Sequence, residues 1–203
     1  FAMSRFSGVW SGMKTIQEVV ESSASVIVDP GRVKIVLPED FAMPPGGMHM
    51  RWPDGALEQE ARLMNFKWYA ALAYVRANKL NHNVIEGRNG GQGDRLGLIA
   101  SGKAYNDTRQ ALADLGLDDD ACRRLGIRLH KVNVVWPLDA TITRDFAQGL
   151  QEILVVEEKR QVIEYQIKEE LYNWRPDVRP NVLGKFDETE GDFSGGEWSM
   201  PNP

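Results

Sequence analysis

The stretch Arg95-Leu-Gly-Leu-Ile-Ala-Ser-Gly-Lys103 predicts a short apolar strand that turns at Ser101-Gly102 into a helix. The same order appears twice more, because apolar runs at 127–135 and 153–156 are each followed by a segment with helical periodicity. Successive strand–helix units are typical of a parallel sheet covered by helices on both faces. We therefore predict an α/β fold, a three-layer α/β/α arrangement with a mainly parallel sheet, to which residues 181–186 add one more strand.

The helices of this region are predicted at 103–115, 139–150 and 162–171. Asp139 has the residue type that caps a helix N-terminus, and Gly116 stands where a glycine commonly ends a helix. In the last helix we expect Glu164 and Lys168 to form an exposed ion pair one turn apart.

The chain before residue 94 is organised differently. A short helix is predicted within 12–22, and two strands are predicted at 26–28 and 33–37 around an Asp29-Pro-Gly31 turn. Residues 38–53 contain four prolines and are predicted to be an irregular connector.

A long helix is the clearest element of this first part. Six apolar residues are spaced by three or four positions and share one face: Leu57, Ala61, Met64, Trp68, Leu72 and Val75. The polar, glycine-rich segment 81–93 follows and is predicted to be a second linker.

Composition excludes several classes of protein. The 203 residues carry 24 Lys and Arg against 29 Asp and Glu, so the chain has no basic field for nucleic acid. No run approaches the ~20 apolar residues that a membrane helix needs. The single cysteine, Cys122, excludes an internal disulfide and any iron–sulfur or cysteine-based zinc site built by this chain alone. We expect a cytoplasmic protein without nucleic-acid or membrane partners.

Ligands of open α/β sheets bind at the carboxyl ends of the strands, so the first turn is a candidate anion site. Ser101 and Gly102 open a helix whose N-terminus favours negative charge, and Lys103 adds a cation. The alternative, which we favour, is an ordinary strand-to-helix turn capped by serine.

Glu157 and Glu158 end the strand at 153–156, where an acid–base carboxylate would be useful. Adjacent strand residues point to opposite faces, so the two carboxylates cannot act as one pair. Salt bridges with Lys159 and Arg160 are the interpretation that we favour.

No other pattern predicts a catalytic or metal site. His49, His82 and His130 share no helix face, which leaves no metal-ligand spacing. The glycines of 87–97 precede a strand instead of joining a strand to a helix, so they do not fit a phosphate loop. We assign no catalytic residue and no metal ligand.

Several longer runs resemble a known family. The runs are Arg5-Phe-Ser-Gly-Val-Trp-Ser-Gly-Met-Lys14, Gly126-Ile-Arg-Leu-His-Lys-Val-Asn-Val-Val-Trp-Pro-Leu138, Val155-Val-Glu-Glu-Lys-Arg160 with the helix after it, and Pro180-Asn-Val-Leu-Gly-Lys-Phe-Asp187. They resemble the long, fused indolepyruvate:ferredoxin oxidoreductases of bacteria. The run from Arg95 to Tyr105 looks like the opening strand and turn of that family's transketolase C-terminal-like domain, which is Rossmann-like.

The resemblance implies an enzyme that decarboxylates aryl 2-oxoacids oxidatively, forms an acyl-CoA and passes electrons through iron–sulfur clusters to ferredoxin. The implied cofactors are thiamine diphosphate, magnesium and the clusters, with coenzyme A as co-substrate. This chain lacks the family's Gly-Asp-Gly…Asn site for magnesium and diphosphate and its cluster cysteines. We therefore expect a piece of a longer polypeptide that binds none of these cofactors, is inactive alone and serves packing or dimerisation.

The resemblance also implies a domain plan. Residues 1–55 would be the tail of a preceding pyrimidine-type domain with a connector, and 56–93 a long helix with a glycine-rich linker. Residues 94–187 would be the transketolase C-terminal-like domain, and 188–203 an irregular tail. The expected partners are the remaining domains of the parent polypeptide, ferredoxin and a second copy.

Two alternatives remain at this stage. One is a stand-alone, flavodoxin-like module that binds a small anion near Ser101 and Gly102. The other is an interaction protein that uses the helix from Leu57 to Val75.

Overall fold

The computed structural model describes residues 1–49, 53–87, 93–158 and 160–185, and the tail 188–203 lies outside these ranges. The chain forms two compact units, Phe1–Lys79 and Leu80–Pro203. The second unit contains the predicted α/β region.

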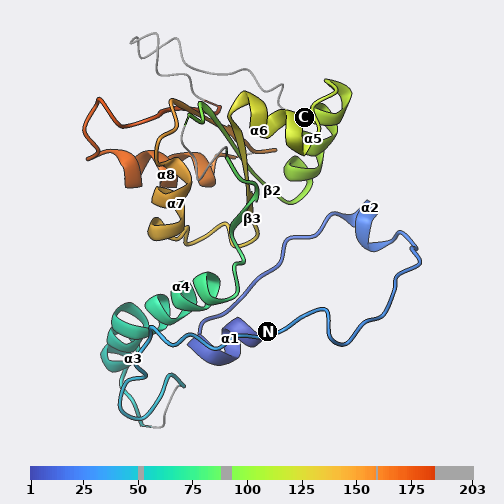
Figure 1. The fold of residues 1–203 in the computed structure, drawn as a ribbon. Helices are drawn as coiled ribbons and strands as arrows, with labels where there is room; N and C mark the ends of the chain where they lie inside the picture. Colours follow the sequence, from blue (N-terminus) through green and yellow to red (C-terminus); the bar gives the residue numbers. More distant parts are fainter. Residues whose placement is uncertain (50–52, 88–92, 159, 186–203) are drawn as a thin grey trace. The chain divides into compact units, whose positions relative to one another are not determined.

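The sheet of the second unit has five strands in the order β1-β3-β2-β4-β5 (Figure 1). The strands are β1 (His82–Ile85), β2 (Leu96–Ser101), β3 (Ile127–Val132), β4 (Glu152–Val156) and β5 (Asn181–Leu183). β2, β3, β4 and β5 run parallel, and β1 pairs antiparallel with β3. The mainly parallel sheet that the sequence predicts is confirmed.

Helices cover both faces of this sheet, as the fold prediction requires (Figure 1). One core joins Leu98 and Leu129 to α5 (Gly102–Asp114) and α6 (Asp119–Leu125) through Leu112 and Cys122. The other core lies against α7 (Ala140–Ala147) and α8 (Ile163–Leu171) and includes Ile99. Because Leu98 and Ile99 are adjacent in β2, they point to opposite faces and bury the strand on both sides.

Gly97 shows how closely α7 approaches the sheet. A Cβ atom at this position would lie 2.5 Å from Leu150 Cδ1 and 2.8 Å from Phe146 Cζ. A glycine inside a strand commonly marks such a close approach. The sheet therefore packs tightly where β2 meets the end of α7.

The first unit consists mainly of helices. They are α1 (Ala2–Ser7), α2 (Gln17–Val20), α3 (Ala56–Arg62), the π-helical turn η1 (Leu63–Lys67) and α4 (Trp68–Ala77). The ring of Phe6 in α1 packs against Phe41 and Tyr74, with centroids 6.2 and 6.0 Å apart. α3, η1 and α4 follow one another without a break, which confirms the predicted long helix.

The predicted apolar face of this long helix is buried only at its C-terminal end. Val75 is buried, whereas Leu57 and Met64 are exposed. Helical spacing shows which residues share a face, but it does not show how far along the helix that face finds a partner.

Two predictions for the first 93 residues are wrong, and one is confirmed over a shorter range. Residues 26–28 and 33–37 form no strand, and the helix predicted within 12–22 is present as α2. The predicted linker 81–93 contains β1, because the edge of β3 offers its backbone a partner. Residues 88–92 of that linker lie outside the described ranges.

The ion pair predicted in α8 exists, but its carboxylate is buried. Lys168 Nζ lies 2.9 Å from Glu164 Oε1, and Glu164 is only 2% exposed. The segment after β5 covers it: the Lys185 N–H donates to Glu164 Oε2 at 2.8 Å. α6, which the sequence analysis did not predict, begins with Asp118 accepting from the Ala121 N–H and ends at Gly126.

None of the helices in the described part of the chain is both long and apolar enough to cross a lipid bilayer.

Candidate functional site

The carboxyl ends of β2 and β4 form the position where an open α/β sheet most often binds a ligand. From β2 the chain crosses to β3 on one side, and from β4 it crosses to β5 on the other. The crossovers diverge between these two strands, which is the topological switch point of the sheet. The predicted anion residues and Glu157–Glu158 therefore lie at the same edge.

The anion candidates open α5. Ser101 is its N-cap but makes no side-chain capping bond, and Gly102 has the left-handed φ of +54°. Lys103 Nζ lies 2.6 Å from Asp107 Oδ2 on the exposed side of the helix. The pKa of Lys103 is raised by this hydrogen bond, by the charge of Asp107 and, more weakly, by Glu158. Carboxylates thus already accompany the cation that an anion would need.

Glu157 closes the N-terminus of α8. Its Oε1 accepts from the N–H groups of Val162 and Ile163, both at 2.9 Å, and its Oε2 accepts from the Glu164 N–H at 3.1 Å. This carboxylate takes the place that a bound anion would occupy at a helix N-terminus. Glu157 is thus a helix cap. Of its two predicted salt-bridge partners, Lys159 lies outside the described residues and Arg160 is exposed.

Asp139 caps α7 as predicted, by accepting from the Ile142 N–H at 2.9 Å. The preceding loop is held by two amide side chains. Asn81 Oδ1 accepts from the N–H groups of Asn133 and Val134, and Gln166 Oε1 accepts from the Leu138 N–H. The amide side chains of Asn81 and Gln166 near the carboxyl end of β3 therefore hydrogen-bond to backbone groups of the second unit.

One carboxyl group near Asp139 has an unusual environment. Burial raises the pKa of Glu170 to about 7, and the charge of Asp139 adds to this effect. Glu170 Oε2 is buried without a hydrogen-bond partner in the described part of the chain. The group is half-buried in α8, so it is a pH-sensitive feature of the packing.

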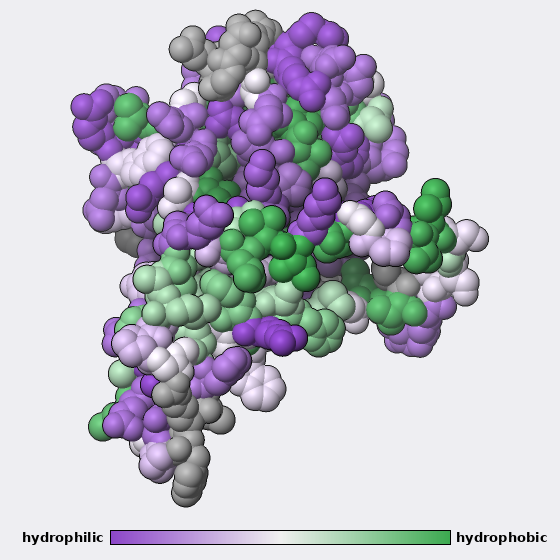
Figure 2. Space-filling model, turned by 60° about the horizontal axis from the view of Figure 1, so that its bottom comes forward, coloured by the Kyte–Doolittle hydropathy of each residue, from purple (hydrophilic) through white to green (hydrophobic). Residues whose placement is uncertain are grey.

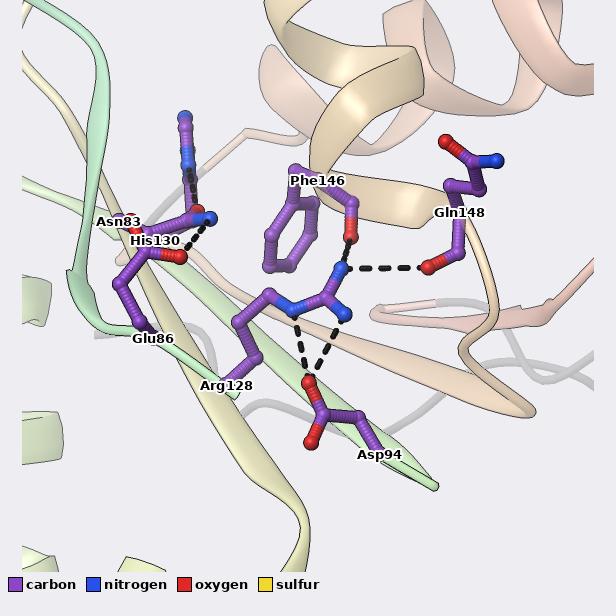
Figure 3. Close-up of polar contacts among 7 residues, drawn as sticks. All are labelled: Asn83, Glu86, Asp94, Arg128, His130, Phe146 and Gln148. Atoms are coloured by element: carbon purple, nitrogen blue, oxygen red, sulfur yellow. Dashed lines mark hydrogen bonds and ion pairs between the residues drawn. The ribbon is translucent and has the colours of Figure 1, made fainter. Parts of the chain in front are cut away.

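A second polar cluster lies at the amino ends of the strands (Figure 3). Arg128 Nε and Nη2 donate to Asp94 Oδ2 at 3.1 and 2.8 Å, in an ion pair that is 5% and 0% exposed. Arg128 Nη1 donates to the carbonyls of Phe146 and Gln148 at the end of α7. A cation there satisfies carbonyls that the helix leaves unpaired. Arg128 therefore links the end of α7 to the sheet, and we call the pair Arg128–Asp94 the clamp.

The sequence analysis missed this clamp. Its one signal was an arginine inside an apolar strand, between Ile127 and Leu129, which is a buried charge in need of a partner. Asp94 could not be assigned to it, because the two residues lie 34 positions apart.

His130 is buried in the middle of β3 (Figure 3). Its Nδ1 lies 2.7 Å from Asn83 Oδ1 in β1, and its ring centroid is 4.9 Å from that of Phe146. Burial lowers the pKa of His130 to about 3, with smaller contributions from His82 and Arg128. The ring is therefore neutral at physiological pH.

In the described part of the chain, no three His, Cys, Asp or Glu side chains are grouped in a way that could hold a metal ion. His82 lies in β1 next to β3, and His49 is exposed in the first unit.

Comparisons with known proteins define the family. Residues 81–203 match the model of the indolepyruvate ferredoxin oxidoreductase middle domain. The chain is 30% identical over 129 residues to an indolepyruvate oxidoreductase subunit IorA from Methanothermobacter thermautotrophicus, which is 64% of this chain and 19% of that protein. It is 28% identical over 102 residues to IorA of Pyrococcus abyssi, which is 50% and 15%. The matched region is thus less than a fifth of either relative.

Among solved structures, a 2-oxoglutarate:ferredoxin oxidoreductase from Magnetococcus marinus aligns with 71% of this chain and 22% of its own. The sequence identity is 14% and the TM-score 0.40. This likeness is too distant to carry an argument. The family match covers more than half of the chain and includes β1 to β5. The chain therefore belongs to the indolepyruvate ferredoxin oxidoreductase family, and residues 81–203 correspond to its middle domain.

Proposed function

We propose that this chain is a structural and dimerisation segment of a larger enzyme that oxidises indolepyruvate or a related aryl 2-oxoacid and reduces ferredoxin. In this proposal residues 94–187 are the transketolase C-terminal-like domain, with β1 as its added edge strand. Residues 1–55 belong to the end of a preceding pyrimidine-type domain. The remaining domains of the polypeptide and a second copy are its partners.

One observation carries the structural role. The helix N-terminus after β4, at the switch point, holds the chain's own carboxylate, because Glu157 accepts from three backbone N–H groups of α8. A diphosphate would have to displace this cap, and it would also meet Asp107 and Glu158 beside Lys103. The carboxyl ends of β2 and β4 are therefore better suited to packing within the protein than to binding an anionic cofactor.

The residues present do not fit the cofactors that the family resemblance implies. An iron–sulfur cluster usually takes four thiolate ligands, whereas this chain has one cysteine, Cys122, which is buried beside α5. We therefore assign thiamine diphosphate, magnesium, the clusters and coenzyme A to other parts of the enzyme, and we expect the 203 residues alone to be inactive.

Isothermal titration calorimetry tests this assignment. Thiamine diphosphate with Mg²⁺ is titrated into the 203-residue chain and, as the control, into the full polypeptide that contains it. We expect binding only to the full polypeptide. Stoichiometric binding to the 203 residues would overturn the assignment. Turnover of indolepyruvate with coenzyme A and oxidised ferredoxin, measured on both proteins, tests the activity itself.

Dimerisation is tested by sedimentation velocity of the full polypeptide. We expect a dimer, and a monomer across the micromolar range would contradict the role in subunit contact.

A second proposal concerns anion binding at Ser101, Gly102 and Lys103. It is favoured by one feature: α5 begins without a side-chain cap, whereas Asp118, Asp139 and Glu157 fill the N-termini of α6, α7 and α8. In a titration with inorganic phosphate that is monitored by NMR, the amide signals of Gly102 and Lys103 should shift, and those of Ile142 and Ile163 should stay unchanged. Equal shifts at all four would indicate only general ionic effects.

A further inference from the structure

Residues 26–37, which we call the arm, have strand-like composition but form no regular secondary structure, and the first unit leaves them uncovered. Its apolar side chains are 49–88% exposed and are Val26, Ile27, Val28, Val33, Ile35, Val36 and Leu37. α2 marks the segment that leads to this arm in Figure 1, and hydrophobic atoms appear green on the same projecting segment at the right of Figure 2. So much β-branched surface in water marks an interaction site.

The turn of the arm is formed, but the segments on either side of it do not pair. These segments, residues 26–28 and 33–37, are called the first and second limb. The Arg32 N–H donates to the Asp29 carbonyl at 3.1 Å, and the Gly31 N–H donates to Asp29 Oδ1 at 2.8 Å. Pro30 fixes a negative φ, and Gly31 does not take the left-handed conformation. Such a turn splays the strands that flank it, whereas close hairpins need the opposite twist. Each limb therefore needs a strand from elsewhere.

The second limb is already hydrogen-bonded along one of its two edges, by the side chain of Asn78. The Val36 N–H donates to Asn78 Oδ1 at 2.9 Å, and Asn78 Nδ2 donates to the Val36 carbonyl at 2.8 Å. In an extended segment, the backbone groups of Ile35 and Leu37 point to the opposite edge. Within the described residues those groups have no hydrogen-bond partner. That edge is open for a strand.

The faces of the arm indicate what kind of partner it needs. Val26, Ile27 and Val28 are consecutive, so they present apolar side chains on both faces of the limb. Ile35 and Leu37 border a cavity of about 410 Å³ that is also lined by Phe6, Met43 and Met48. A second copy of the arm would complete the hydrogen bonds but leave these faces in water. Strands that are apolar on both faces are typical of a layered α/β sheet, in which helices cover both faces.

We propose that residues 26–28 and 33–37 add as strands to the open edge of a layered β-sheet in an adjoining domain of the same polypeptide. The matched region of this chain is only 19% of the IorA subunit from Methanothermobacter thermautotrophicus, and the matched family is a middle domain. A polypeptide of that length offers such a domain. This inference rests on the proposed function for the existence of the larger polypeptide, but not for its reaction.

Hydrogen exchange measured by mass spectrometry tests the inference on the full polypeptide and on the 203-residue chain. We expect the amides of 26–28 and 33–37 to exchange about 100-fold more slowly in the full polypeptide. Equal, fast exchange in both proteins would overturn the inference. Protection in the short chain that grows with its concentration would also overturn it, because a second copy would then be the partner.

Variants of the full polypeptide sharpen this test. Val28→Asp with Ile35→Asp should restore fast exchange in the arm, whereas the matched control Leu115→Asp, at an exposed site of the second unit, should not. Protection that survives the double substitution would contradict strand addition. Turnover of indolepyruvate on the wild-type polypeptide separates the two proposals, because a protected arm without turnover would overturn only the proposed function.

Discussion

β2 and the second limb of the arm are similar in composition but differ in their surroundings. Leu96–Ser101 lies between two parallel strands and under helices on both faces, with Ile99 1% exposed. Residues 33–37 are also rich in aliphatic side chains, but within the described residues only Asn78 lies along one edge of this limb, and Ile35 is 60% exposed.

The difference teaches that strand-like composition needs a partner at the edge and a cover on the face. β2 has both, because the connection from β2 to β3 contains α5 and α6, the connection from β3 to β4 contains α7, and these crossovers bring helices onto the sheet. The arm has a turn that splays its limbs, so it cannot supply its own partner. Four predictions test how strongly each region depends on its partners.

The largest effect is expected at the clamp of the second unit. Arg128→Met removes the cation that pairs with the buried carboxylate of Asp94, which should lower the free energy of unfolding by about 3–5 kcal/mol. The control Arg175→Met breaks an exposed pair with Asp177 and should cost less than about 1 kcal/mol. Urea unfolding measures both. If Arg128→Met does not fold, Arg128→Met with Asp94→Leu should recover a folded protein, and no recovery would contradict the clamp.

A matched pair of isoleucines compares the sheet and the arm directly. Ile153→Ala removes a side chain that is fully buried under α7 and α8 and should cost about 2–5 kcal/mol. Ile35→Ala should change the free energy of unfolding of the 203-residue chain by less than about 0.5 kcal/mol. Equal losses would show that the arm is already packed in this chain.

Acid should weaken the second unit through His130. Its folded pKa of about 3 lies below the unfolded value of 6.5, so the unfolded state binds the proton first. Stability from this group is present above pH 6.5 and should fall by about 1.4 kcal/mol per pH unit below it. His130→Gln should flatten this slope in urea titrations between pH 6.5 and 4.5. His49→Gln, at an exposed site of the first unit, should leave the slope as it is.

Glu170 should give the smallest effect, and with the opposite sign. Its folded pKa of about 7 lies above the ordinary value of 4.5, so its contribution to stability is lost as the pH rises from 4.5 through 7. Glu170→Gln should raise the free energy of unfolding at pH 8 by on the order of 1 kcal/mol, since partial exposure screens the effect, and give no gain at pH 4. Glu169→Gln, on the exposed side of α8, is the control. An equal gain at both pH values would contradict the assignment.

Most of the second unit could be predicted from local sequence. β2, β3 and β4 follow from their apolar runs, and Asp139 was predicted as the cap that it is. These signals suffice because each lies within a few residues of the element that it controls. α6 had an equally local signal in Asp118 and Gly126, which the sequence analysis did not use.

Two other misses share a physical cause, which is a contact between residues far apart in sequence. β1 is a strand only because β3 offers it an edge, and Glu164 is buried only because the segment at Lys185 covers it. The candidate anion residues were placed correctly at the carboxyl edge. The capping of α8 by Glu157 was not predicted, because its partners begin five residues away and a turn has to bring them to the carboxylate.

The sequence by itself determined the α/β class, the order of the strands along the chain and the family, because periodicity, caps and motif runs are local. It also limited the chain to one cysteine, which is too few to ligate an iron–sulfur cluster by itself. Only the tertiary structure decided which strands pair, which charges are buried and which apolar segment stays open. Those outcomes depend on edges and faces supplied by distant parts of the chain, and the arm at 26–37 is exposed because the described residues supply neither.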